Sequence, residues 1–457
     1  MNTGLTEQYP ACLDALLTGS QHAGREFIID GVTHADVLAM AAGLYRTTRE
    51  INGPVCLCSD RRQVLAAALL ASLMGGPPLL LPPSLAAHTL FRMHRESNFS
   101  TILTDADKKP DLPANVRIIR ADSLPTRAAE PNPATPDSID PDRKLLYIYT
   151  GGSTGRPKIW AKTAGNIFGE ALYLARHFGI TEQDRILATM PPLHIYGLLF
   201  SVLLPLVTGA GVAADTPAFP GDIAKSVKKR RITILAAVPP HYRVLRGVDL
   251  HNSSLRLAVS SAGPLAEKDS LTFYRNSGIG VVEVFGSTET GGIGTRNRAL
   301  NEEIFTPFAP VDLQSRDNRL TVRSPFLSPD LPRTKDGFFI SADRVEMRSG
   351  GFLPMGRTDT IAKVGGKRVD LEEIREQICR ITGVEECVVL SLTDPGGRGE
   401  VIGALIQGTA DLKKVKAMLT DRLEPHARPK ILRHTDRIPI RANGKYDRPA
   451  ILKLLQQ

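Results

Sequence analysis

Glycine, hydroxyl and lysine side chains concentrate in Leu145–Lys158, where an apolar run leads directly into Thr150-Gly-Gly-Ser-Thr-Gly-Arg-Pro-Lys158. Glycines allow backbone N–H groups to close around anionic oxygens, hydroxyls donate further hydrogen bonds, and the lysine adds positive charge. The segment is not a Walker A loop, because Arg156 and Pro157 separate the last glycine from the lysine. It predicts a phosphate-binding loop, with a flexible surface loop as the alternative. The candidate phosphate ligands are Thr150, Gly151, Gly152, Ser153, Thr154, Gly155 and Lys158.

Short apolar strands and amphipathic helices surround this loop. Stretches such as Asp60–Met74 and Gly165–Phe178 have helical periodicity. Fully apolar strands separated by helices are typical of parallel β-α-β units, so we predict an α/β fold with a large N-terminal domain of mainly parallel sheets flanked by helices. The predicted strands are Pro54–Cys58, Pro78–Leu81, Ser100–Leu103, Val116–Ile119, Leu145–Thr150, Arg185–Thr189, Ile232–Val238, Leu255–Ser260 and Val281–Phe285.

The pattern changes after Gly356-Arg-Thr-Asp359. The rest of the chain is long enough for a small domain of mixed helices and strands. We therefore predict a large domain over 1–356 and a small α+β domain over 360–457, joined by residues 357–359. The elements predicted for the small domain are helices at Leu371–Arg380 and Leu412–Leu423 and strands at Val384–Leu390 and Val401–Ile406.

The composition excludes several classes of protein. The chain has 457 residues, of which 42% are hydrophobic and 23% charged, as in soluble globular proteins. The start shows no secretory signal, and the apolar stretch Tyr196–Ala214 contains Pro205 and polar residues, which favours buried core over a membrane span. The chain has 5 cysteines, and Cys56-x-Cys58 lacks zinc-site spacing, so we predict a reducing, cytoplasmic location and no structural metal.

Positive charge is concentrated near the C-terminus. The formal net charge is +9, and Asp411–Gln457 alone has 12 basic and 5 acidic residues, or +7. A solvated surface is one interpretation, and a docking face for a phosphate-bearing cofactor or an acidic carrier protein is the other. Nucleic acid is not expected as a partner, because aromatic residues make up 5% of the chain and no nucleic-acid-binding motif is present.

The glycine-rich segment and later motifs resemble, in order, those of the AMP-forming adenylate ligases, which include acyl-CoA synthetases, aryl-CoA ligases, adenylation domains and luciferases. In the first motif Gly151 replaces a family serine, and in the Thr-Gly-Asp motif Ala342 replaces a glycine. The first 140 residues resemble the family only in general character. The later motifs are Pro191-Pro-Leu-His-Ile-Tyr-Gly197, Val284-Phe-Gly-Ser-Thr-Glu-Thr290, Gly337-Phe-Phe-Ile-Ser-Ala-Asp343, Gly356–Ile374 and Asn443-Gly-Lys-Tyr-Asp-Arg448.

The resemblance implies a reaction in which a carboxylate attacks the α-phosphorus of ATP, pyrophosphate leaves, and a thiol captures the acyl-adenylate. Glu289 is implied as the ligand of Mg²⁺ and Thr288 as a contact of the α-phosphate. Phe285, where the family usually has tyrosine, is implied to stack on adenine. Asp343 is implied to bind the ribose with support from Arg357. The nucleotide pocket is further implied to include Ala262, Gly263 and Gly286.

The small domain is implied to be mobile. Lys445 matches the family lysine that bridges the attacking carboxylate and the α-phosphate, and a solvated surface lysine is the alternative. Asp359 matches the hinge about which the small domain turns. Gly365 and Gly366 are implied to line the channel for the thiol of CoA or of a carrier protein's phosphopantetheine, with a simple β-turn as the alternative.

The acid is expected to have an apolar tail or an aromatic ring. His194 stands where amino-acid-activating relatives have aspartate, so no carboxylate is available there to pair a substrate ammonium. The following residues Ile195, Tyr196, Leu198, Leu199 and Phe200 are expected to form an apolar wall, with Gly197 leaving room at the pocket floor. Val238–Tyr242 resembles another pocket-lining segment of the family. His194 as a core histidine is the alternative.

The sequence therefore predicts an ATP-dependent acid–thiol ligase that uses ATP, Mg²⁺ and either CoA or an acyl carrier protein. Three alternatives stay open: an enzyme that stops at the acyl-adenylate, one that passes it to oxygen or an amine, and a non-catalytic nucleotide or acyl sensor with the same fold. The identity of the acid, the acceptor and the oligomeric state are not determined by the sequence.

Overall fold

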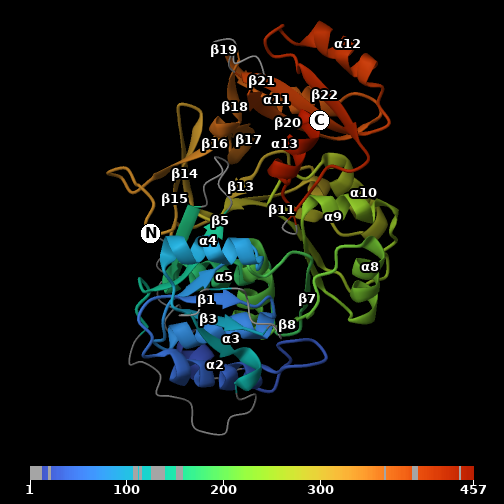
Figure 1. Cartoon of the computed structure of the whole chain (residues 1–457). Coiled ribbons are helices and arrows are strands. Elements are labelled where there is room, and N and C mark those ends of the chain that lie inside the picture. The colour runs from blue at the N-terminus through green and yellow to red at the C-terminus, as the bar shows by residue number, and fades with distance from the viewer. Residues whose placement is uncertain are drawn as a thin grey trace. The chain divides into compact units, whose positions relative to one another are not determined.

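The computed structural model describes residues 13–18, 22–105, 112, 116–124, 139–150, 158–364, 367–393, 400–441 and 444–457. The chain forms two compact units (Figure 1). The first unit comprises Met1–Leu313 and Val322–Phe339, and the second comprises Gln314–Thr321 and Ile340–Gln457. Each unit has its own hydrophobic core.

A six-stranded sheet in the first unit has the order β4-β3-β1-β2-β5-β6. Strands β1 to β5 are parallel, and β6 is antiparallel to β5. Because β1, β2 and β3 are buried along their whole length, their apolar sequences suit a parallel sheet covered on both faces. The elements are α2 His34–Thr48, β1 Val55–Cys58, α3 Arg62–Leu73, β2 Leu79–Leu81, α4 Ala87–Ser97, β3 Thr101–Thr104, β4 Arg117–Arg120, β5 Lys144–Thr150, β6 Lys158–Thr163 and α5 Ala164–His177.

A second sheet in the same unit has seven strands in the order β13-β12-β11-β10-β9-β7-β8. Strands β11, β10, β9, β7 and β8 are parallel, whereas β12 and β13 continue the sheet in antiparallel fashion. The elements are β7 Arg185–Ala188, α6 Ile195–Leu198, the π-helix η2 Leu199–Leu203, α7 Leu204–Thr208, β8 Gly211–Val212, α8 Pro220–Lys229, β9 Ile234–Ala237, α9 Pro239–Val244, β10 Leu257–Ser260, α10 Glu267–Ser277, β11 Val281–Ser287, β12 Gly291–Asn297 and β13 Thr306–Pro307.

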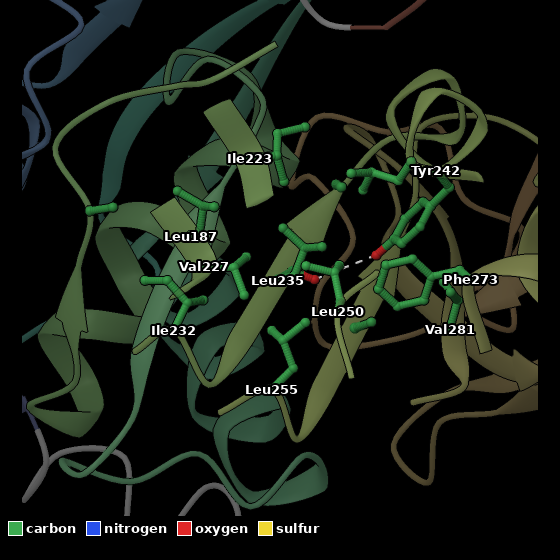
Figure 2. Packing of buried hydrophobic residues seen from close by; sticks show 14 of the residues in the cluster. Leu187, Ile223, Val227, Ile232, Leu235, Tyr242, Leu250, Leu255, Phe273 and Val281 are labelled. Atoms are coloured by element: carbon green, nitrogen blue, oxygen red, sulfur yellow. Dashed lines mark hydrogen bonds between the residues drawn. The ribbon is translucent and has the colours of Figure 1, made fainter. Parts of the chain in front are cut away.

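The core of the second sheet packs side chains from its parallel strands against α8, α9 and α10 (Figure 2). Tyr242 and Phe273 meet edge to face, with ring centroids 5.0 Å apart. The Tyr242 hydroxyl donates to the Val259 carbonyl at 2.8 Å and lies 3.5 Å from the Leu235 carbonyl, so the buried phenol does not remain unpaired.

One arginine connects the two sheets of the first unit. Arg62, at the start of α3, is 1% exposed, and burial lowers its pKa to about 10. Its guanidinium donates to the carbonyls of Ala188, at the end of β7, and of Ala214 and Asp215, just after β8. The helix beside the first sheet is thus bonded to strand ends of the second.

The apolar stretch that begins at Tyr196 is buried core, as predicted. It forms α6, η2, α7 and β8, and residues 196–213 are buried except Val207. None of the helices formed by the described residues combines the length and apolar character that a membrane-spanning segment needs.

The second unit contains β16 and β17, which belong to a four-stranded sheet in the order β14-β15-β16-β17, together with the hairpin β18-β19 and the sheet β20-β21-β22. Val389, Ile402 and Ile406 pack against α11 and α12 in its main core. The elements are β14 Asp312–Arg316, β15 Arg319–Arg323, β16 Phe339–Arg348, β17 Gly351–Arg357, β18 Ile361–Val364, β19 Lys367–Asp370, α11 Leu371–Cys379, β20 Val384–Thr393, β21 Glu400–Gly408, α12 Leu412–Arg422, β22 Ile431–Thr435 and α13 Arg448–Gln456.

The predicted fold class is confirmed: the sheets of the first unit are mainly parallel, and the second unit mixes helices with smaller sheets. The predicted strands match β1 to β5, β7 and β9 to β11 within a few residues at their ends. The compact units meet in sequence at Phe339 and Ile340, before the proposed hinge at 357–359. A division by packing does not identify the torsions about which a unit turns, so the hinge stays a prediction.

Candidate active site

The C-terminal ends of four parallel strands bring several of the predicted site residues to one edge of the second sheet. His194 follows β7, Val238–Tyr242 follows β9, Ala262 follows β10, and Phe285 lies near the end of β11. The loops at this edge of an open α/β sheet are the usual place for a ligand. Residues far apart in the sequence are therefore neighbours here because their strands are adjacent.

The predicted phosphate loop joins the ends of two antiparallel strands. Thr150, the last residue of β5, is the register partner of Lys158, the first residue of β6. The Lys158 ammonium lies 6.0 Å from the centre of the Trp160 ring. The predicted ligands Gly151, Gly152, Ser153, Thr154 and Gly155 lie outside the described residues. The structure therefore fixes the positions of the two ends of the predicted loop, which lie at one edge of the first sheet.

The turn between β11 and β12 carries Thr288 and Glu289, and hydroxyls fix its shape. The amide of Ser287 donates to Thr290 Oγ1 at 3.1 Å, the amide of Thr290 donates to Ser287 Oγ at 3.2 Å, and the two hydroxyl oxygens are 2.9 Å apart. Thr288 and Glu289 lie between these paired residues and are half-buried. The two side chains assigned to phosphate and metal are thus presented on a closed turn.

Gly286 permits a close approach of the two strands that flank this turn. It pairs with Gly292 across the hairpin, beside a register shift between Phe285 and Gly286. A Cβ atom at Gly286 would lie 2.4 Å from the carbonyl oxygen of Gly291, which is far inside van der Waals contact. The role of this glycine in the hairpin is therefore steric.

The predicted adenine wall contains two neighbouring aromatic rings, inclined to one another by 58°, and a residue with a left-handed backbone conformation. Phe285 is half-buried, and its ring centroid lies 5.5 Å from that of Phe305, over which the Arg296 guanidinium sits at 4.3 Å. Ala262 has a φ of 72°, in the left-handed region that costs an L-residue with a Cβ about 1–2 kcal/mol. Backbone strain of this kind is found at ligand-binding loops more often than elsewhere.

The predicted acyl wall is largely packed core. Leu198, Leu199 and Phe200 are at most 5% exposed, and the Tyr196 hydroxyl donates to the carbonyls of Val259 at 2.8 Å and Ala237 at 3.2 Å. His194 and Ile195 are the half-buried residues of this segment. The expectation that Gly197 opens the pocket floor is wrong, because a Cβ there would lie 2.1 Å from the carbonyl oxygen of Pro191. That glycine instead allows a helix to approach the backbone.

His241 is a buried histidine at the same edge. Its Nδ1 lies 2.6 Å from the hydroxyl of Thr189, which follows β7. Burial lowers the pKa of His241 to about 4, so the ring is neutral at physiological pH. The sequence analysis placed His241 in a pocket-lining segment but did not foresee this pair, because the contact joins residues 52 positions apart.

Two buried charged residues near the β11–β12 turn were missed by the sequence analysis. Lys162 in β6 is 0% exposed and Glu170 in α5 is 2% exposed. The amide of Gly292 donates to Glu170 Oε1 at 2.7 Å, and the Lys162 ammonium donates to the carbonyl of Phe326 at 3.0 Å. The sequence did contain a signal for the burial of Glu170, because this residue lies on the apolar stripe of the helix formed by Ile167, Ala171 and Leu174.

In the second unit Asp343 and Arg357 are direct partners. They are paired across β16 and β17, and the guanidinium donates to the Asp343 carboxylate at 3.1 Å. The carboxylate is 18% exposed, so it can still be reached. Thr358 Oγ1 donates to the carbonyl of Ala342 at 3.2 Å. The two residues assigned to the ribose are therefore held together within one unit.

Lys445 is an exposed residue of the second unit. Its carbonyl accepts from the Arg441 amide at 2.8 Å, and Ile440 and Tyr446 form an antiparallel bridge. The hinge residue Asp359 lies in the short helical turn Thr358–Thr360. Gly365 and Gly366 lie outside the described residues. The roles assigned to these four residues stay predictions.

The donor set fits magnesium bound together with a nucleotide. Among the described residues no three His, Cys, Asp or Glu side chains gather so as to hold a metal by themselves. Mg²⁺ usually takes one or two carboxylates and completes its shell with substrate phosphates and water. The half-buried carboxylate of Glu289, with Thr288 next to it in sequence, would suit such an arrangement.

Comparison with known proteins agrees with these observations. A model of the AMP-binding enzyme family matches residues 31–318. A sulfoacetate–CoA ligase of Cupriavidus necator is 28% identical over 377 residues, 76% of this chain and 73% of the relative. A feruloyl-CoA synthase of Amycolatopsis sp. is 26% identical over 364 residues, 72% of this chain and 73% of the relative.

Solved structures share the fold of the whole chain. ATP-bound MatB from Rhodopseudomonas palustris superposes with a TM-score of 0.82 at 20% identity and covers 97% of this chain and 98% of its own. The o-succinylbenzoate CoA synthetase (MenE) of Bacillus subtilis with ATP and a magnesium ion gives a TM-score of 0.79 at 21% identity, over 98% and 99%. The family match extends over more than half of the sequence. The prediction from the motifs is thereby confirmed, and this chain belongs to the AMP-binding enzymes of the AMP-forming adenylate ligase superfamily.

Proposed function

We propose that this enzyme joins a carboxylic acid with an apolar tail or aromatic ring to a thiol, using ATP and Mg²⁺ and forming an acyl-adenylate on the way. The observation that carries the proposal is the gathering of His194, Ala262, Phe285 and the Thr288–Glu289 turn at one edge of a parallel sheet. Family membership indicates the general class of reaction, and these residues have the side chains that such a reaction needs.

Each residue has a task that follows from the charges in the reaction. Negative charge builds on phosphate oxygens as the carboxylate attacks, so cations and fixed donors lower the barrier. Lys158 and the adjoining glycine-rich loop bind the outer phosphates, and Thr288 donates to the α-phosphate. Glu289 binds Mg²⁺, which when present neutralises phosphate charge. Lys445 brings a further positive charge between the carboxylate and the α-phosphate.

Asp343 and Phe285 hold the nucleoside. A carboxylate accepts hydrogen bonds from two neighbouring hydroxyls, and Arg357 orients that carboxylate through its hydrogen bond at 3.1 Å. Phe285 offers a ring face for adenine, backed by Phe305. These contacts bind ground state and transition state alike, so their loss is expected to raise the KM for ATP more than it lowers kcat.

The nature of the acid is inferred from the chemistry around His194. Histidine and isoleucine at this half-buried position offer no carboxylate to an ammonium group, which argues against amino acids as substrates. The relatives named above are described as ligases of acids as different as sulfoacetate and ferulate, so the family alone does not select the acid. An apolar tail or ring is the class that the neighbouring side chains favour.

CoA is the proposed acceptor, and a carrier protein is the second candidate. The relatives named above are CoA ligases. The carrier protein is favoured by the +7 charge of Asp411–Gln457 and by a similarity of 26% to part of a surfactin synthase subunit of Bacillus subtilis. Among the described residues all four cysteines are free thiols, as expected for the proposed cytoplasmic location.

The deciding experiment measures acid-dependent pyrophosphate release over a panel of fatty, aromatic, amino and dicarboxylic acids, with CoA or holo-carrier protein as acceptor. Thioester formation, followed by mass spectrometry, is the expected outcome for fatty or aromatic acids. Hydroxamate formation without thioester would indicate an enzyme that stops at the adenylate. ATP binding with no pyrophosphate release for any acid would support the sensor alternative and refute the proposal.

Lys445→Ala tests the assigned chemistry within this assay. Loss of one transition-state donor is expected to lower acid-dependent pyrophosphate release by about 100-fold or more. Thioester formation from supplied acyl-adenylate should stay within about two-fold of wild type, because that step no longer involves the α-phosphate attack. Lys453→Ala, which removes an exposed lysine of α13 in the same unit, is the matched control and should change neither step.

A further inference from the structure

Lys162 and Glu170 place two opposite charges inside the first unit, close to the turn that carries Glu289. Lys162 is 0% exposed and Glu170 is 2% exposed. Burial lowers the pKa of Lys162 to about 8 and raises the pKa of Glu170, and the opposite charges of Glu170 and Glu289 partly offset the shift of Lys162. Neither Lys162 nor Glu170 has a part in the function proposed above. Even so, Glu170 is hydrogen-bonded to Gly292 at the end of the turn, and the charge of Lys162 interacts with that of Glu289.

The turn is fastened on both sides. From α5, Glu170 Oε1 accepts from the amide of Gly292 at 2.7 Å. From the segment after β15, the amide of Ser328 donates to the carbonyl of Glu289 at 2.8 Å. Lys162 holds the segment of the second support, because its ammonium donates to the carbonyl of Phe326, two residues before Ser328, at 3.0 Å.

The turn packs tightly against Phe326 and Glu170 at Gly291. A Cβ atom at Gly291 would lie 2.6 Å from Cβ of Phe326 and 2.8 Å from Glu170 Oε2, so the turn rests directly on both groups. Glu170 Oε2 is buried and has no hydrogen-bond partner among the described residues. The carboxylate thus faces the turn with one oxygen bonded and the other in close contact.

Stability alone does not account for such a pair. Removing a lysine and a glutamate from water costs several kcal/mol per charge, and replacing a buried pair by apolar residues is often neutral or stabilising. A pair of this kind is therefore better explained by the conformation that it selects. Here the conformation selected is that of the turn from Thr288 to Gly292.

We propose that Lys162 and Glu170 are positioning residues that hold the β11–β12 turn so that the Glu289 carboxylate is set in advance for the metal–nucleotide complex. The inference rests on the proposed role of Glu289 and adds two residues that the family motifs do not include. It assigns to the pair a contribution to Mg·ATP binding that is separate from any contribution to folding.

The double variant Lys162→Met/Glu170→Leu tests this inference, because it removes both charges without leaving one of them unpaired. Hydrogen exchange of the peptide 286–293, without any ligand, is expected to be at least about ten-fold faster than in wild type. Calorimetry should give an affinity for Mg·ATP lower by about ten-fold or more, whereas the affinity for ATP in EDTA changes by less than about two-fold. The thermal midpoint of unfolding reports whether the variant is folded.

The matched control is Arg246→Met/Asp269→Leu, which removes a buried carboxylate of α10 and one of its two arginine partners in the same unit. The other partner, Arg243, has a side chain that is 25% exposed, so water can solvate its charge. It should leave both the exchange of 286–293 and the affinity for Mg·ATP unchanged. A folded Lys162/Glu170 variant with wild-type affinity for Mg·ATP overturns the proposal. If the wild-type protein itself does not bind Mg·ATP, the proposed function fails, and the exchange of 286–293 alone then decides whether the pair positions the turn.

Discussion

Substitution of Gly286 by alanine has a consequence that can be worked out from the hairpin. The added Cβ would lie 2.4 Å from the Gly291 carbonyl oxygen and 2.9 Å from Cα of Gly292. Ordinary van der Waals contact begins at 3.4 Å, so the opposite strand must move by about 1 Å. Both contacts are with backbone atoms, which cannot rotate away as a side chain would. We expect a loss of about 1–3 kcal/mol in the free energy of unfolding, as for other overpacked sites.

The same displacement should affect catalysis more than stability. The strand that moves continues into the turn with Thr288 and Glu289, and a misplacement of about 1 Å can lower the rate by about 100-fold. The expected signature is a fall in acid-dependent pyrophosphate release of about that size, measured at saturating ATP and acid under conditions in which urea titration shows the variant to be folded.

The matched control for this experiment is Gly169→Ala. A Cβ at Gly169, inside α5, meets no atom within 4 Å, so this variant should be more stable by about 0.5–1 kcal/mol and fully active. The reasoning is refuted if folded Gly286→Ala releases pyrophosphate within about two-fold of wild type. It is equally refuted if both variants lose activity to a similar extent.

Two further predictions concern His241 and Ala262. The folded pKa of His241, about 4, lies below its ordinary value of 6.5, so its contribution to stability is complete above pH 6.5 and is lost as the pH falls to 4. The difference in unfolding free energy between wild type and His241→Gln, from urea titrations, should therefore change by about 3 kcal/mol between pH 7 and pH 4, and a constant difference would contradict the buried, neutral ring. Ala262→Gly should raise the free energy of unfolding by about 0.5–1 kcal/mol, because glycine tolerates the φ of 72°; a destabilised variant would show that the left-handed conformation is not strained.

Much of the fold was predictable because its signals are local. Val55–Cys58 and Leu79–Leu81 are uninterrupted apolar runs, and such runs form parallel strands buried on both faces. The antiparallel strands β12 and β13 were not predicted, since Gly291–Asn297 has six glycine or polar positions among its seven residues and owes its strand conformation to pairing with β11. Pairing across a sheet is a tertiary effect that propensity does not report.

In the candidate site, too, the residues with local signals were predictable and their long-range contacts were not. Glu289, Asp343 and Phe285 could be named in advance because they stand in motifs of fixed spacing. The partners that hold them could not, since Gly292 is bonded by a residue 122 positions earlier in the chain. Gly197 was misjudged for a related reason: a glycine can make room for a ligand or for the protein's own backbone, and only the position of Pro191 distinguishes the two.

The strand order of the first sheet bears on any attempt to shorten the protein. Strand β5, which leads into the phosphate loop, is flanked by β2 on one side, with Leu79 opposite Leu146 and Leu81 opposite Ile148. A fragment starting near residue 140, where the recognisable motifs begin, would keep β5 and β6 as an isolated ribbon with a bare apolar edge, prone to self-association. The N-terminal third, although it contains none of the predicted ligands, is for this reason an integral part of the first sheet, and libraries or fusions should preserve it whole.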